Sequence, residues 1–61
     1  MTFVMIKFVL TKADGTGFTR EHLASRDNIS WLAREYANVN DGVCRAYEGE
    51  KLICTIDPKG V

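Results

Sequence analysis

Apolar residues recur with a helical period in the middle of the chain, in the segment DNISWLAREYANVN at residues 27–40. Their spacing of three and four residues places these side chains on one face of an amphipathic helix. We therefore expect this segment to form a helix that buries this face and ends near Val39, with residues 40–42 supplying the stop. The face consists of Ile29, Leu32, Ala33, Tyr36 and Ala37.

Trp31 lies outside this apolar face. At about 100° per residue, its side chain is roughly 200° from that of Ile29 around the helix axis, so it points outward. Its neighbours there are Arg34, Glu35 and Asn38. Because Trp offers a large apolar area at small entropic cost, we interpret Trp31 as an anchor for a protein partner. The alternative is a Trp that lies on the helix surface or under a loop.

Polar residues mark both ends of the expected helix. Asp27 or Asn28 is suited to accept hydrogen bonds from amides of the first turn. At the other end, Gly42 fits a left-handed stop position. Asn40 is expected to belong to this helix stop, although its amide would also be able to bind a partner.

Alternating side chains over residues 2–11 predict a strand, and Asp14-Gly15 predicts a hairpin turn after it. The strand that returns over residues 18–24 has two registers, which the sequence leaves open. A two-residue turn would place Leu23 opposite Ile6, Glu21 opposite Phe8 and Thr19 opposite Leu10. A turn longer or shorter by one residue would instead bring in Phe18, Arg20 and His22.

A second hairpin is expected from residues 43–47 and 52–56, around Glu48-Gly49-Glu50. A three-residue loop would pair Ala46 with Leu52 and Cys44 with Cys54. The helix would then cover Cys44, Ala46, Leu52, Cys54 and Ile56, and the other face would carry Arg45, Tyr47, Ile53 and Thr55. Residues 57–61 would form a short tail, with Pro58 ending the strand.

The order strand, strand, helix, strand, strand implies an α+β fold. We expect a single domain over residues 1–61, in which one small antiparallel sheet of two hairpins carries the amphipathic helix on one face. The other face of the first strand would expose Phe3, Met5 and Val9. An exposed apolar face of this kind is typical of a contact with another chain. The alternative is that these side chains are buried within the chain's own small core and termini.

Composition excludes several classes of function. Eight basic and eight acidic residues give zero net charge, whereas phosphate binding requires a basic surplus, so no direct nucleic-acid partner is expected. Lys7 interrupts the longest apolar stretch, which is also far shorter than the ~20 residues of a spanning helix, so no membrane partner is expected. The N-terminus has no signal-peptide pattern, and we expect a cytosolic location.

Side chains that could carry chemistry are few. The one histidine, His22, and the two cysteines, Cys44 and Cys54, show neither a catalytic pairing nor the spacing of a zinc site. We therefore expect no enzyme, no metal and no cofactor. A disulfide is conceivable if the cysteines lie opposite each other, but a reducing cytosol favours two thiols in the core.

The segment FTREHLASRDNISWLAREYANVNDGVCRAYEGEKLICTIDPKG, residues 18–60, resembles the Dmd (discriminator of mRNA degradation) antitoxins of T-even-type bacteriophages. The likeness covers essentially the whole chain and is weakest at residues 11–16. It is densest at Phe18-Thr19, at Asp27 with Trp31, at Glu35-Tyr36-Ala37 with Val39-Asn40, and at Cys54 with Asp57.

This resemblance implies an inhibitor without catalytic activity. Dmd-like proteins bind host endoribonuclease toxins of the RNase LS type, RnlA or LsoA, and occupy their active-site groove, which protects phage mRNA. The Trp and the Asn important for inhibition match Trp31 and Asn40, and Arg34, Glu35 and Asn38 would form a polar rim. The expected partner is thus a host toxin in the cytoplasm of the infected bacterium. The alternative is a self-associating module that forms a weak homodimer through the outer face of the first strand or through an exposed sheet edge.

Overall fold

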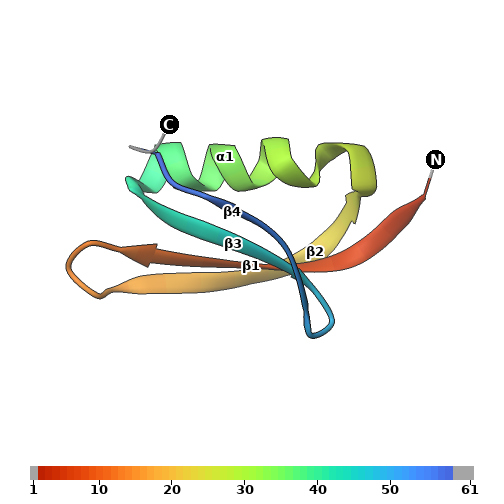
Figure 1. Ribbon diagram of the computed structural model, residues 1–61, viewed down its shortest axis with the longest axis horizontal. Coiled ribbons are helices and arrows are strands. Elements are labelled where there is room, and N and C mark those ends of the chain that lie inside the picture. Colours follow the sequence, from red (N-terminus) through yellow and green to blue (C-terminus); the bar gives the residue numbers. More distant parts are fainter. Residues whose placement is uncertain (1, 59–61) are drawn as a thin grey trace.

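The computed structural model describes residues 2–58, and these form a four-stranded antiparallel sheet with one helix on it (Figure 1). The expected α+β fold and its element order are confirmed. In chain order the elements are β1 (Phe3–Lys12), β2 (Gly17–Ser25), a 3-10 turn (Arg26–Asn28), α1 (Ile29–Asn40), β3 (Gly42–Glu48) and β4 (Lys51–Ile56).

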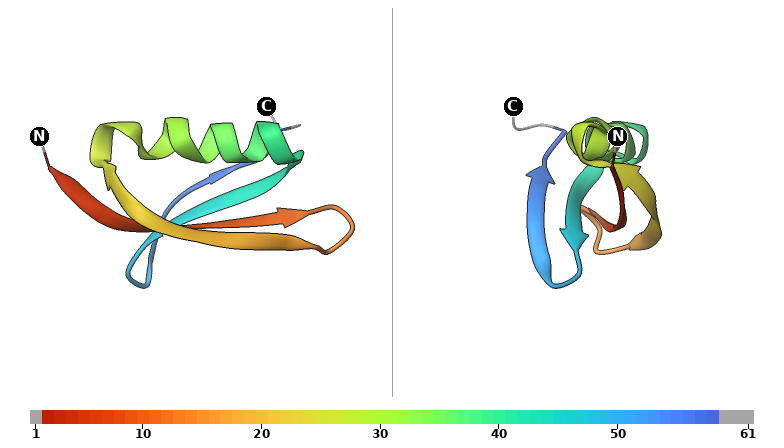
Figure 2. Two further views of the ribbon diagram at one scale, coloured as in Figure 1. Left: turned by 180° about the vertical axis from the view of Figure 1, so that it is seen from behind. Right: turned by 90° about the vertical axis from the view of Figure 1, so that its right-hand side faces the viewer.

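The strands lie in the order β2-β1-β3-β4, so β2 and β4 are the two edges of the sheet. Helix α1 crosses one face and packs mainly on β3, β4 and β1. Seen end-on, the sheet curls under the helix, with β4 on one side of it and β2 on the other (Figure 2). This arrangement leaves one flank of α1 facing β2.

The first hairpin turns through a three-residue loop, Ala13–Gly15. The Lys12 amide donates to the Thr16 carbonyl at 2.7 Å, and the Gly15 amide donates to the Lys12 carbonyl at 3.0 Å. Gly15 has φ 90°, the positive value that such a loop needs at its last position. This loop selects the second of the two registers, in which Arg20 lies opposite Phe8.

The Asp14 side chain supports the same turn. Its Oδ1 accepts hydrogen bonds from the Thr16 hydroxyl at 2.6 Å and from the Thr16 amide at 3.0 Å. These two bonds stabilise the charged carboxylate, and they lower the pKa of Asp14 below its usual value.

The expected pairing of the second hairpin is wrong. Glu48 lies opposite Lys51, so the loop has two residues, and a bulge shifts the register between Ala46 and Tyr47. Cys54 therefore lies opposite Ala46, and Cys44 lies opposite Ile56. Gly49, the first residue of the loop, has φ 63°, which a two-residue hairpin turn accepts readily from glycine.

The bulge also corrects two of the expected faces. Leu52 lies opposite Tyr47 and remains 48% exposed, whereas the prediction placed it under the helix. Ile53, which was expected on the outer face, packs against the core. One extra residue in a strand reverses the side of every residue beyond it, so a loop length guessed from sequence could not place both.

The core lies between α1 and the concave face of the sheet, and most of the expected helical face is in it. Ala33 and Ala37 are fully buried and Ile29 nearly so, while Leu32 and Tyr36 are half-buried. Two alanines against the sheet allow a close approach of the helix. The buried apolar residues are Ile6, Phe8, Leu10, Ala24, Ile29, Ala33, Ala37, Cys44 and Ala46.

The helix ends differ from expectation. Asn28 occupies the N-cap position of α1 but its side chain makes no cap hydrogen bond, and Asp27 lies in a 3-10 turn over residues 26–28 that precedes the helix. At the other end Asp41, not Gly42, is left-handed, with φ 52°. Gly42 serves a different purpose, because a Cβ there would lie 2.8 Å from the Thr11 carbonyl oxygen.

An ion pair joins the helical segment to the sheet. Arg26 forms a two-pronged ion pair with Glu48, with both nitrogen–oxygen distances 3.1 Å, and joins the start of the helical segment to the end of β3. Both side chains are partly exposed, so the pair contributes about 0–1 kcal/mol to the free energy of unfolding.

Of the tail expected at residues 57–61, residues 59–61 lie outside the described part.

Candidate protein-binding surface

Trp31 points away from the core, as the helical periodicity predicts. Its side chain is 59% exposed, whereas Ile29 on the opposite side of α1 is 3% exposed. No other aromatic residue of the helix is so accessible, since Tyr36 is half-buried. An exposed indole on a rigid helix can enter an apolar pocket of a partner with little loss of conformational entropy.

A hollow of about 390 Å³ lies between α1 and β2. Because Trp31 precedes Glu35 by four residues, the indole lies one helical turn from this hollow, along the same ridge. The hollow is large enough for one bulky side chain of a partner. Its lining residues are Phe18, Arg20, Leu32, Glu35, Tyr36, Val39 and Asn40.

Asn40 lies at one end of this α1–β2 hollow and is half-buried. Its side-chain Nδ2 donates to the Tyr36 carbonyl oxygen at 2.9 Å. The bond ties the Asn40 side chain back onto the last turn of α1, and the left-handed Asp41 follows it. Asn40 therefore belongs to the end of the helix, near the stop that its position in the sequence indicates, and lines the hollow.

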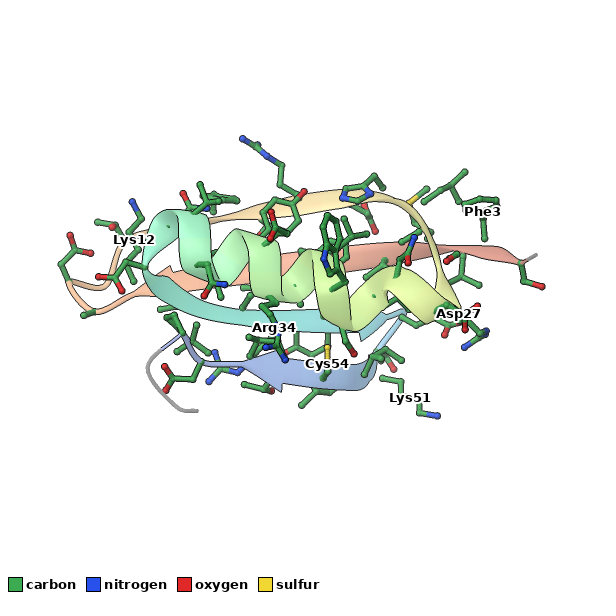
Figure 3. The ribbon with its side chains drawn as sticks, turned by 90° about the horizontal axis from the view of Figure 1, so that it is seen from above. Phe3, Lys12, Asp27, Arg34, Lys51 and Cys54 are labelled. Carbon is green, nitrogen blue, oxygen red and sulfur yellow. The ribbon has the colours of Figure 1, made fainter. Side chains whose placement is uncertain are left out.

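The structure divides the five expected site residues. Glu35 and Asn40 line the α1–β2 hollow, whereas Trp31 lies outside it, one helical turn before Glu35. Arg34 projects from α1 toward β4, on the side away from β2 (Figure 3). Asn38 is exposed, between the two flanks of the helix. The expected polar rim thus spans the whole outward face of α1, and of its three residues Glu35 lines the hollow.

An aromatic cluster forms the floor beside the hollow, and sequence reasoning missed it. The His22 ring stacks on Phe8, with centroids 5.1 Å apart, and His22 Nε2 lies 3.0 Å from the Tyr36 hydroxyl. His22 Nδ1 lies 3.0 Å from the Leu23 carbonyl, which can only accept, so Nδ1 donates and Nε2 accepts from Tyr36 in the neutral ring. The cluster holds Tyr36 in place.

Charges of opposite sign flank the hollow. Arg20 of β2 lies over the Phe18 ring, with 4.9 Å between the guanidinium carbon and the ring centroid. Glu35 of α1 lines the same hollow. Val39, 78% exposed, extends the apolar surface to the end of the helix. The signal for this flank was in the sequence, because Leu32 and Val39 are seven residues apart, two helical turns along the same side.

The cysteines are free thiols on the helix-facing side of the sheet. Burial, together with the nearby Cys54, raises the pKa of Cys44 to about 11, so this thiol stays protonated at neutral pH and is a poor nucleophile. Residues 2–58 contain no cluster of three or more His, Cys, Asp or Glu side chains arranged to hold a metal ion.

Two known structures or sequences resemble this chain, and both are of one antitoxin. Antitoxin Dmd of Enterobacteria phage T4 is 28% identical over 60 residues, which is 98% of this chain and 100% of the relative. A crystal structure of Escherichia coli toxin LsoA in complex with T4 phage antitoxin Dmd matches with a TM-score of 0.87 and 27% identity, covering 92% of this chain and 98% of the matched chain. The chain resembles Dmd in sequence and in fold.

The resemblance to Dmd noted in the sequence is therefore confirmed over nearly the full length. Trp31 and Asn40 both fall inside the 60 residues aligned with Dmd. No protein-family model matches the chain. The only α-helix among the described residues, α1, is too short and too polar to cross a membrane.

Proposed function

We propose that this chain is an antitoxin of the Dmd type, which binds an endoribonuclease toxin of the LsoA or RnlA kind and blocks its active-site groove. The consequence would be protection of phage mRNA in the cytoplasm of the infected bacterium. The observation that carries this proposal is the 59% exposure of Trp31 on a chain that matches Dmd along its length. The chain would act by contact alone.

In this mechanism Trp31 enters an apolar pocket of the toxin. The α1–β2 hollow beside it receives a side chain of the toxin in return, so that two protruding groups interlock. Asn40 uses one amide hydrogen for the Tyr36 carbonyl and keeps its second hydrogen and its carbonyl oxygen for the partner. If a mutation in the toxin left the Asn40 amide buried without a partner, the free energy of binding would become less favourable by about 1–3 kcal/mol.

Binding and occlusion are separate steps of the proposal, and one experiment tests both. Purified LsoA is titrated with this chain by calorimetry, and cleavage of an mRNA by LsoA is followed in parallel. We expect binding, with loss of cleavage at the same molar ratio. Binding without loss of cleavage would contradict occlusion, and absence of binding would contradict the choice of LsoA.

Self-association is a second candidate, favoured by the outer face of the sheet. Phe3 and Met5 are 58% and 51% exposed, and Leu23, directly opposite Met5, is 60% exposed. Val9, which was expected to join this face, is half-buried. Light scattering on a size-exclusion column at low and high concentration measures the mass, and a dimer that Met5→Lys dissociates would support this candidate.

A further inference from the structure

The sheet has an unpaired edge beside the α1–β2 hollow. Strand β2 is nine residues long and pairs only with β1. The helix does not cover its edge, because α1 packs mainly on β1, β3 and β4. Long open edges are sites where a further strand can add, and proteins usually protect them.

The direction of the backbone groups on this edge follows from the hairpin turn. The Lys12 amide bonds to the Thr16 carbonyl, and bonded and non-bonded pairs alternate along an antiparallel ladder. Phe18, Arg20 and His22 therefore bond to β1, and the amides of Thr19, Glu21 and Leu23 point away from it. The Leu23 carbonyl already accepts from the His22 ring, which agrees with an outward direction.

The hollow lies directly inside this edge. Phe18 and Arg20 line it from β2, and Leu32 and Glu35 line it from α1. Side chains of an added strand that lie opposite Phe18 would point to the same side of the sheet as Phe18 does, because opposite residues in a ladder share a face. A strand bound to the edge would thus direct one of its side chains into the hollow.

The charges on β2 disfavour a second copy of this chain as the added strand. Two β2 strands that pair antiparallel about the middle of the edge set either Arg20 against Arg20 or Glu21 against Glu21. Like charges directly opposite each other destabilise a strand pair. A different segment, with charges in complementary order, avoids this repulsion.

We infer that the free edge of β2 receives an extended segment of the toxin as a fifth strand, with an apolar side chain opposite Phe18 that fills the α1–β2 hollow, an acidic side chain opposite Arg20 and a basic side chain opposite Glu21. This inference rests on the proposed function and names how the toxin is held. Backbone bonds along the edge supply affinity, and the hollow and the two charges supply register and specificity.

Hydrogen exchange of the backbone amides, measured by NMR on the wild-type chain with and without LsoA, tests the inference directly. We expect the amides of Thr19, Glu21 and Leu23 to become protected in the complex. The amide of Thr55 is the internal control, because by the same alternation it points outward from β4 at the opposite edge. It should exchange at the same rate in both states.

A pair of matched variants provides a second measurement. Glu21→Pro removes an outward amide without removing a bond to β1, and it should weaken LsoA binding about 10-fold or more. Thr55→Pro makes the same change at the other edge and should alter binding by less than about twofold. Glu21→Gln, which keeps the amide, separates the charge from the backbone bond. If Glu21→Pro fails to fold, the exchange data on the wild type decide.

Three outcomes would contradict the inference, and they can be told apart. Tight binding of LsoA while the three edge amides still exchange at their free rates would show that the toxin does not use the edge. Protection of these amides in the chain alone, rising with its concentration, would make a second copy the occupant. If wild-type chain does not bind LsoA at all, the proposed function fails, and the inference fails with it.

Discussion

The side-chain amide of Asn40 donates to the backbone carbonyl of Tyr36, with 2.9 Å between Nδ2 and O. This bond links the end of helix α1 to the residue that forms the floor of the α1–β2 hollow. An Asn that completes the helix and faces the proposed partner serves stability and binding at the same time. A substitution there should therefore change both.

Asn40→Asp should destabilise the chain by about 1 kcal/mol and weaken toxin binding. The carboxylate cannot donate to the Tyr36 carbonyl, and its negative charge lies at the unfavourable end of the helix dipole. Asn38→Asp places the same charge in the same turn without breaking the bond, and it is the matched control. Thermal unfolding measures the stability of the two variants, and calorimetry measures their affinity for the toxin. If both variants lost the same stability and affinity, the Asn40–Tyr36 bond would have no role.

Trp31→Ala should weaken binding to LsoA by roughly 2–4 kcal/mol, the range of interface hot spots. The melting temperature should hardly change, because the indole is 59% exposed in the free chain. Leu52→Ala, which truncates a 48% exposed residue on the outer face of the sheet, is the control. If calorimetry gave similar LsoA affinities for the two variants, Trp31 would not be an anchor for the toxin.

Glu35 and Arg34 are adjacent in sequence but lie on different flanks of α1. Since Glu35 lines the hollow and Arg34 points toward β4, Glu35→Ala should reduce LsoA affinity more than Arg34→Ala. We expect about 1 kcal/mol or more for Glu35→Ala and less than about 0.5 kcal/mol for Arg34→Ala. The reverse order, measured by titration, would move the contact surface to the β4 side.

Tyr36→Phe should lower the free energy of unfolding by about 1 kcal/mol, because His22 Nε2 loses the hydroxyl 3.0 Å away. For a domain of this size that corresponds to a fall of roughly 4–8 °C in Tm. The ring contact with Phe8, at 5.1 Å between centroids, remains. Tyr47→Phe removes a hydroxyl from the other face of the sheet, and its Tm should stay close to that of the wild type.

The buried thiol of Cys44 should make stability depend on pH in the alkaline range. Its pKa rises from 9.0 to about 11 in the folded chain, chiefly by burial, so the unfolded chain loses this proton first. The free energy of unfolding should thus decline between pH 9 and pH 11, and the full contribution should be present below pH 9. Denaturant unfolding at several pH values measures this decline.

Cys44→Ala is the comparison for that experiment. The variant should be less stable below pH 9 because it leaves a cavity, but the part of the alkaline decline that belongs to the thiol should disappear. In the wild type at pH 8, iodoacetamide should modify Cys54 well before Cys44. Equal rates of modification would show that Cys44 is more accessible than its burial indicates.

The sequence by itself determined the features that depend on neighbouring residues. The helical period predicted which residues of α1 face the sheet and that Trp31 points outward, and alternation separated the two faces of β1. The resemblance to Dmd singled out Asn40 as a partner-binding residue, whereas its position in the sequence alone favoured a helix stop. These features are local, because a side chain's direction within one helix or strand follows from its position in that element.

Only the tertiary structure decided how the elements fit together. Loop lengths selected the register of β2 and the bulge in β4, and they moved Leu52 outward and Ile53 inward. The hollow beside Trp31 required the register that brings Phe18 next to α1. The physical reason is that such contacts join backbone segments far apart in the chain, as where Gly42 lies against the Thr11 carbonyl, and no local pattern encodes their distance.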